Sequence, residues 1–131
     1  MNLKKYEIVY VTRESSNLAG ARYRAYNFCK KLKELNYNCR VISYAEDLGA
    51  LSGNLEQFLR LSSKINYNIK AYKAFSKLRN PFFIIQRFNY HSLAVLLFCM
   101  KHGIKYAYDL DDWEFRENID YILSVLPRSK A

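Results

Sequence analysis

The feature that most constrains the fold is a fourfold alternation between two hydrophobic patterns. Short runs of β-branched and aromatic residues predict buried strands, and each is followed by apolar residues at the three-to-four spacing of a helix. The predicted strands are 6–12, 39–45, 82–88 and 104–110, and the predicted helices begin near 21, 54, 91 and 118. Such alternation favours a parallel sheet with right-handed crossovers. We therefore predict an α/β, Rossmann-like open parallel sheet of four strands in the order 3-2-1-4, with helices on both faces.

Length and composition fit one folded domain. The chain has 131 residues, of which 50% are hydrophobic and 25% charged, and this balance excludes a disordered tail. No linker divides it, so residues 1–131 are expected to form a single Rossmann-like domain. The longest apolar run, LAVLLFCM, has 8 residues, whereas about 20 are needed to span a bilayer. Three cysteines without CxxC spacing predict buried, reduced thiols in a cytoplasmic protein.

The net charge of +9 is unevenly distributed along the chain. Residues 1–108 contain 18 Lys/Arg and 6 Asp/Glu, whereas residues 109–131 contain 3 and 6. A basic body with a local acidic segment indicates an anionic partner, such as a phosphorylated ligand or an anionic membrane surface. Nucleic acid is disfavoured because the tyrosines form no basic-aromatic platform that the sequence reveals.

The predicted helix over 54–79 leaves two interpretations open. Its cations lie beside or opposite an apolar stripe; they are Lys64, Lys70, Lys73, Lys77 and Arg79. They form either the solvated face of a helix packed on the core or a basic surface for an anionic membrane. The second interpretation would make the protein peripheral at a membrane.

The loop after the first predicted strand is a candidate anion site. Gly20 precedes a helix whose first turn carries Arg22 and Arg24, and cations there oppose the helix dipole. A bound anion would reverse that effect, because free N–H groups and both guanidiniums would converge on it. The alternative is that these arginines are solvated or paired with nearby aspartates. The glycine spacing matches neither GxGxxG nor GxxxxGK[ST], which argues against ordinary dinucleotide and P-loop chemistry.

The third predicted strand ends in QRFNYH, which contributes Arg87 as a ligand-binding candidate and His91 at a helix start. His91 has two interpretations, as a capping or surface residue and as a ligand contact. In the order 3-2-1-4 the first and fourth strands adjoin, so the loops after them would share a crevice at the carboxyl edge of the sheet.

The fourth predicted strand ends in a cluster of carboxylates, Asp109, Asp111 and Asp112. They could hold a hard metal cation, divide acid and base roles, or orient a substrate while pairing with arginines across the crevice. The catalytic residues cannot be assigned from the sequence, and these three aspartates with His91 are the candidates.

Three short motifs, in order, resemble the N-terminal half of GT-B-fold glycosyltransferases of the family 4 (group 1) type. They are Arg22-Tyr23-Arg24 at the first helix, Gln86-Arg87 after the third strand, and Tyr108 to Asp112 after the fourth. The resemblance covers nearly the whole chain. It implies an acceptor-side domain that faces a separate donor-binding domain across a cleft, with metal-independent, retaining sugar transfer from a nucleotide-sugar.

The resemblance also implies roles for the candidate residues. Gly20, Arg22 and Arg24 would face donor phosphates or the acceptor, and the three aspartates would shape the acceptor side without a metal. No cofactor is expected of this chain, because the donor would bind the second domain. A nucleotide-sugar and a glycosyl or lipid-linked acceptor would be partners of the completed enzyme.

The chain also departs from that family. No two glutamates stand eight apart, as the donor-holding Glu-x7-Glu element requires, and strands of the first domain are missing. We therefore expect a truncated, incomplete N-terminal half that is inactive alone. One alternative is a non-catalytic α/β module that binds an anionic ligand, a membrane surface or a partner protein, with self-association through the open sheet edge beside the fourth strand. Another is a metal-dependent phosphoryl-transfer enzyme built on Asp109 and Asp111.

Overall fold

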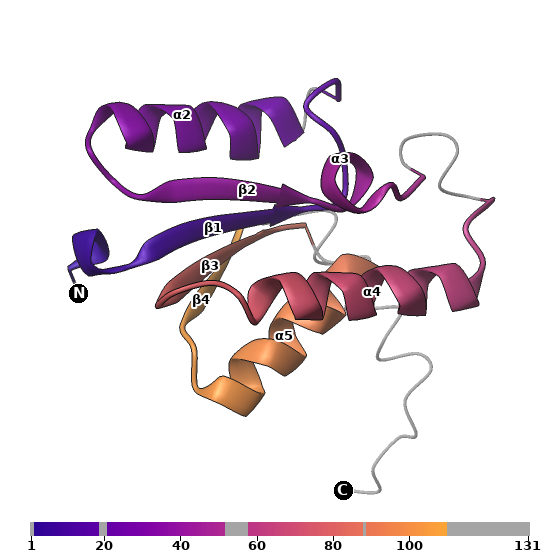
Figure 1. The fold of residues 1–131 in the computed structure, drawn as a ribbon. Coiled ribbons are helices and arrows are strands. Elements are labelled where there is room, and N and C mark those ends of the chain that lie inside the picture. Colours follow the sequence, from indigo (N-terminus) through magenta and orange to yellow (C-terminus); the bar gives the residue numbers. More distant parts are fainter. Residues whose placement is uncertain (1, 19–20, 52–57, 88, 110–131) are drawn as a thin grey trace, which may run out of the picture.

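The computed structural model describes residues 2–18, 21–51, 58–87 and 89–109 (Figure 1). Four parallel strands form one sheet: β1 Glu7–Thr12, β2 Cys39–Ser43, β3 Pro81–Gln86 and β4 Tyr106–Asp109. The helical elements are η1 Leu3–Lys5, η2 Arg22–Tyr26, α2 Asn27–Glu34, α3 Tyr44–Leu48, α4 Leu61–Phe75 and α5 Tyr90–His102. The predicted fold class, an open parallel α/β sheet with helices, is confirmed.

The strand order is β2-β1-β3-β4, which differs from the expected order 3-2-1-4. β3 pairs with the free side of β1, with Ile8 opposite Phe82, and β4 then pairs with β3. β1 is buried along its whole length, including Glu7, whose carboxylate pairs with Arg40 of β2. A strand that is apolar on both faces can pair on either side, so its sequence does not specify which strand becomes its second neighbour.

Helices cover the two faces of the sheet differently. α2 lies on one face over β1 and β2, and α4 and α5 lie together on the other (Figure 1). The smaller core cluster, between the sheet and α2, includes Ile8, Tyr10 and Cys29. Cys29, Cys39 and Cys99 are all buried and free, as predicted. In the described part of the chain, no helix has the length and apolar character needed to cross a bilayer.

The larger core cluster is built on three phenylalanine rings. Phe75 of α4, Phe83 of β3 and Phe98 of α5 contact one another edge-to-face, with centroids 5.0–5.9 Å apart. The first two are fully buried and the third nearly so. Because each ring comes from a different element, this contact holds α4 and α5 together against β3.

The first helix turns a different face to the core from the one predicted. The spacing predicted Ala21, Ala25, Phe28, Leu32 and Leu35 as the apolar face. Ala21, Ala25 and Cys29 are buried, whereas Phe28 and Leu35 are more than half exposed. η2 is a π-helical turn in which the Asn27 N–H donates to the Arg22 carbonyl. Five-residue hydrogen bonding rotates the following turns relative to an ideal α-helix, which explains the change of face.

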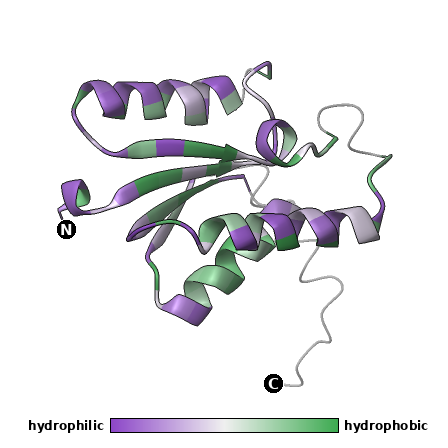
Figure 2. Ribbon diagram, viewed as in Figure 1, coloured by the Kyte–Doolittle hydropathy of each residue, from purple (hydrophilic) through white to green (hydrophobic). Residues whose placement is uncertain are grey.

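α5 was expected to be buried because it is apolar nearly all round, and Figure 2 shows hydrophobic residues over most of it. Its inner face is buried, but Leu93, Leu97 and Met100 are exposed. Within the described residues no element lies over that outer face. The predicted stop at Gly103 is confirmed, since this residue has φ 64° and its N–H donates to the Cys99 carbonyl.

Candidate functional site

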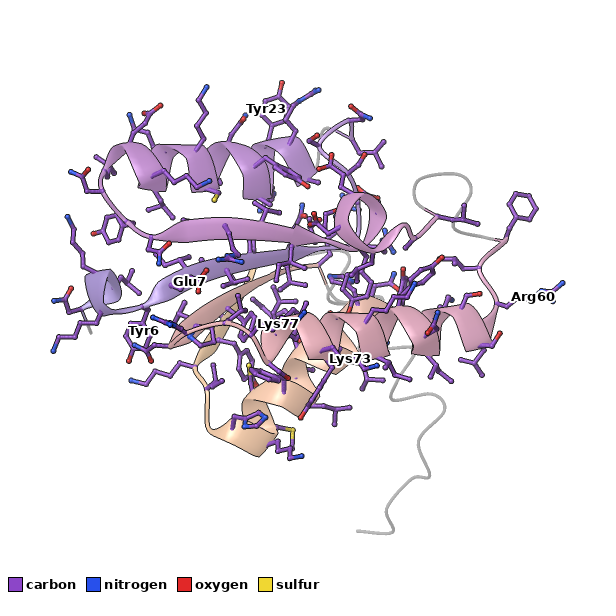
Figure 3. All side chains as sticks on the ribbon, viewed as in Figure 1. Tyr6, Glu7, Tyr23, Arg60, Lys73 and Lys77 are labelled. Atoms are coloured by element: carbon purple, nitrogen blue, oxygen red, sulfur yellow. The ribbon has the colours of Figure 1, made fainter. Side chains whose placement is uncertain are left out.

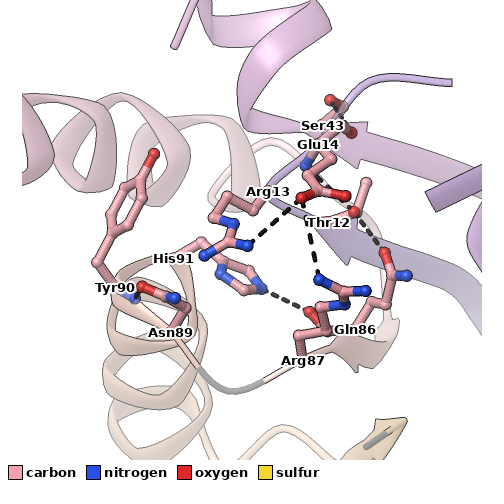
Figure 4. A network of polar contacts seen from close by, with 9 residues as sticks. All are labelled: Thr12, Arg13, Glu14, Ser43, Gln86, Arg87, Asn89, Tyr90 and His91. Carbon is pink, nitrogen blue, oxygen red and sulfur yellow. Dashed lines mark hydrogen bonds and ion pairs between the residues drawn. The ribbon is translucent and has the colours of Figure 1, made fainter. Parts of the chain in front are cut away.

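The crevice at the carboxyl edge of the sheet lies between β1 and β3. The chain leaves β1 toward β2 on one side and continues from β3 toward β4 on the other. Strand order therefore reverses at this point, which is where open α/β sheets bind ligands. The prediction paired the loops after the first and fourth strands, but β3 stands between them. The residues that meet here are Thr12, Arg13, Glu14, Gln86 and Arg87 (Figure 4).

Two guanidiniums approach one carboxylate oxygen at this crevice. Arg13 Nη2 lies 3.4 Å and Arg87 Nη1 lies 3.9 Å from Glu14 Oε1. The side chains of Arg13 and Glu14 are 12% and 13% exposed, whereas that of Arg87 is 30% exposed. These three groups together carry one net positive charge, so the crevice favours an anion.

Backbone contacts fix the position of Arg87. It adopts φ 66°, in the left-handed region that non-glycine residues rarely occupy. Its N–H donates to the Asp109 carbonyl at 3.0 Å, and its own carbonyl accepts from Ser92 Oγ at 3.1 Å. Arg87 is therefore held between the end of β4 and the first turn of α5. Local strain of this kind is associated with functional sites.

The floor of the crevice is a set of uncharged hydrogen bonds. Thr12 Oγ1 donates to Gln86 Oε1 at 2.5 Å, and both residues are buried. Ser43 Oγ, at the end of β2, donates to the Glu14 carbonyl at 2.8 Å. The ends of β1, β2 and β3 are thus connected, which gives the two arginines a rigid support.

His91 lies beneath this floor and is fully buried. Its Nε2 contacts the Gln86 carbonyl at 2.7 Å, so Nε2 carries the proton of the neutral ring. Burial lowers the pKa of His91 to about 3, and Arg13 and Arg87 lower it further, against the hydrogen bond to Gln86, which raises it. His91 is neither a surface nor a capping residue. Asn89 caps α5, with its side chain accepting the Tyr90 N–H.

Arg24 and Asp109 meet at a second part of the same edge. Arg24 Nη1 donates to Asp109 Oδ1 at 2.7 Å, which is the arginine–aspartate pairing considered from the sequence. The pair borders a groove lined by Tyr10, Phe28 and Ile84, on the sheet face that α2 leaves uncovered. This part of the edge therefore combines a polar pair with an apolar wall.

The loop after β1 is attached to α3 through Glu46. Glu46 accepts hydrogen bonds from the Ser16 N–H at 2.8 Å, Ser16 Oγ at 2.6 Å and the Tyr26 hydroxyl at 2.8 Å. The two Ser16 bonds, followed by that from Tyr26, lower the pKa of Glu46. Burial and the bond to Glu46 raise the pKa of Tyr26. This carboxylate sets the course of the loop that leads from the crevice toward η2.

The predicted site residues are brought together only in part. Arg24, Arg87 and Asp109 lie at one edge, whereas Arg22 is exposed with its guanidinium 5.3 Å from the Tyr23 ring centroid. Gly20, Asp111 and Asp112 lie outside the described residues. In the described ranges no three His, Cys, Asp or Glu side chains group as metal ligands.

Sequence reasoning missed Arg13, Glu14 and Glu46. Arg13 and Glu14 directly follow the first predicted strand, and this position was the available signal. Their partner Arg87 depends on the strand order, which the sequence did not reveal.

Comparison with known proteins identified no relative. No protein-family model, no curated protein and no solved structure matches this chain. The resemblance to glycosyltransferases therefore stays a prediction from the chain's own motifs.

Proposed function

We propose that this domain binds a phosphate-bearing sugar ligand at the carboxyl edge of its sheet, as the acceptor side of a glycosyltransferase. One observation carries the proposal: guanidiniums from the ends of β1 and β3 approach the same oxygen of Glu14 at the switch point. A phosphate offers several acceptor oxygens and more negative charge than a carboxylate, and arginine forks match its geometry.

Arg87 is the residue that exchanges partners. It is more exposed than Arg13 and lies farther from Glu14, so it can turn to a phosphate while Arg13 retains the carboxylate. Before the ligand arrives, Glu14 holds both guanidiniums near their working positions. The neutral floor beneath them, including the uncharged His91, adds no negative charge that would repel the ligand.

The adjoining groove supplies contacts for the sugar. A pyranose ring has an apolar face that fits Phe28 and Tyr10, and hydroxyl groups that can bond to Asp109 and Arg24. Small-ligand sites usually combine an apolar wall with a few oriented polar groups in this way.

In glycosyl transfer, the bond from the anomeric carbon to the donor phosphate oxygen breaks, and a bond to an acceptor hydroxyl oxygen forms. The departing phosphate takes the bonding electrons, and the hydroxyl proton passes to a base. Fixed cations near the phosphates stabilise the charge that develops. This chain's part is to bind and orient the acceptor, with Arg87 neutralising phosphate charge.

Calorimetric titration of the 131-residue chain with glucose 1-phosphate, UDP-glucose and inorganic phosphate tests the proposal. Arg87→Gln is expected to weaken glucose 1-phosphate binding about ten-fold, because a charged hydrogen bond is lost. The matched control is Arg79→Gln, which removes the same charge from an exposed position just after α4. Equal weakening by both variants would mean that net charge, not the crevice, attracts the ligand.

A second comparison separates the sugar from the anion. Asp109→Asn should weaken glucose 1-phosphate binding and leave inorganic phosphate binding unchanged. If sugar phosphates bind no better than phosphate, the domain is instead a module for anionic ligands. Binding that requires Mg²⁺ would favour the phosphoryl-transfer alternative on Asp109 and Asp111.

A further inference from the structure

An apolar stripe on the outer surface of α4 and α5 is not used by the core. We define the α4–α5 stripe as Leu61, Ile65 and Ile69 of α4 with Leu93, Leu97 and Met100 of α5. Each of these six side chains is between 49% and 77% exposed. Contiguous apolar surface of this kind marks an interaction site in a folded protein.

The spacing shows that the stripe is a continuous face of two packed helices. Its members recur every three or four residues, which places them along one side of each helix. Ile65, Ile69, Leu93 and Leu97 line one shared groove, so the two helices contribute to the same surface. The opposite sides carry the buried core residues, such as Phe75, and do not depend on the stripe.

The charge around the stripe is of one sign. Residues 57–108 contain nine Lys/Arg and no Asp or Glu. Lys73 comes one turn after Ile69 on α4, and Lys101 comes one turn after Leu97 on α5, and both lysines are exposed. Figure 3 shows Arg60 at the start of α4 and Lys73 and Lys77 farther along it.

This charge pattern selects the partner. A second copy of the same face would place lysines against lysines, and like charges at an interface are unfavourable. A bilayer that contains anionic lipid offers the complement, with negative headgroups around an apolar interior. Lysine stems can lie along apolar surface while their ammonium groups reach the headgroups.

We propose that the α4–α5 stripe docks on the surface of an anionic lipid bilayer. The six apolar side chains enter the boundary between headgroups and acyl chains, and the lysines beside them contact lipid phosphates. The helices lie parallel to the membrane and do not cross it, which is the arrangement of interfacial amphipathic helices. The proposal is independent of the ligand proposed for the crevice.

Co-sedimentation of the 131-residue chain with vesicles tests it. The chain is expected to bind vesicles of phosphatidylglycerol mixed with phosphatidylcholine and to remain in solution with phosphatidylcholine alone. Ile65→Ser with Leu97→Ser should lower the partition coefficient about ten-fold through lost apolar contact. The matched control is Phe28→Ser with Leu35→Ser, which removes two equally exposed apolar side chains from α2 and should leave binding unchanged.

The electrostatic part has its own pair of variants. Lys70→Gln with Lys73→Gln should lower the partition coefficient roughly ten-fold, since each lysine near an anionic surface contributes a several-fold gain. Lys30→Gln with Lys31→Gln on α2 makes the same change in net charge and should have a much smaller effect.

Three results would overturn the proposal. The first is no binding to anionic vesicles, and the second is equal loss in the α2 control variants. The third is sedimentation velocity showing a wild-type dimer that Ile65→Ser with Leu97→Ser converts to monomer, which would identify the stripe as an interface between copies.

Discussion

The buried imidazole of His91 predicts how the stability of this domain depends on pH. The ring is fully buried, and burial lowers its pKa from the ordinary value of 6.5 to about 3. In the unfolded chain the same ring takes up a proton near pH 6.5. Because the folded pKa is the lower one, the stability contribution is complete above pH 6.5. It is lost progressively as the pH falls from there toward 3.

The expected magnitude follows from this difference in proton binding. Each pH unit well below 6.5 removes about 1.4 kcal/mol until the folded ring titrates. Between pH 7.5 and pH 5 the sum is about 2 kcal/mol, because the first part of this interval lies on the flat side of the transition. The folded ring stays neutral over the whole interval, so its own titration adds nothing.

Urea unfolding followed by circular dichroism at pH 7.5, 6 and 5 measures this loss. His91→Gln retains a donor for the Gln86 carbonyl but does not titrate, so its stability is expected to change about 2 kcal/mol less between pH 7.5 and pH 5. His102→Gln is the control, because His102 is the other histidine and is exposed. The reasoning is refuted if His91→Gln keeps the full pH dependence of the wild type, or if His102→Gln abolishes it.

Three further predictions concern stability. Phe83→Ala removes the central ring of the larger core and should cost about 3–5 kcal/mol in urea unfolding, whereas Phe28→Ala, at an exposed ring, should change stability by less than about 1 kcal/mol. Similar losses for the two would contradict the observed packing. Asn89→Ala removes the cap of α5 and should cost about 1 kcal/mol, measured by thermal unfolding; no change would mean that the capping box contributes nothing. A double-mutant cycle on Arg24 and Asp109 should give a coupling below about 1 kcal/mol that falls in high salt, because both side chains are partly exposed. A coupling that salt does not alter would show a desolvated pair instead.

The helix faces mark the limit of prediction from periodicity. Spacing correctly identified helical segments in α4 and α5, but it did not establish which apolar face meets the core. Ile65 and Leu97 satisfy the helical pattern as well as Phe75 and Phe98 do. Only the position of β3 selects the phenylalanines for burial and leaves the α4–α5 stripe outside.

The candidate site divides along the same line. The pairing of Arg24 with Asp109 was among the alternatives from sequence, because both residues were expected at the carboxyl edge of one sheet. The convergence of Arg13 and Arg87 on Glu14 was not anticipated, because it requires β1 and β3 to be neighbours.

By itself the sequence determined the elements, the fold class and the stop at Gly103, because these depend on residues close together along the chain. Strand order, the buried faces of the helices and the location of the switch point were decided only by the tertiary structure. The physical reason is that β1 is apolar on both faces and pairs through its backbone, so either side of it can accept a neighbour. The packing of Phe75 and Phe98 against Phe83 accompanies the placement of β3 on its second side.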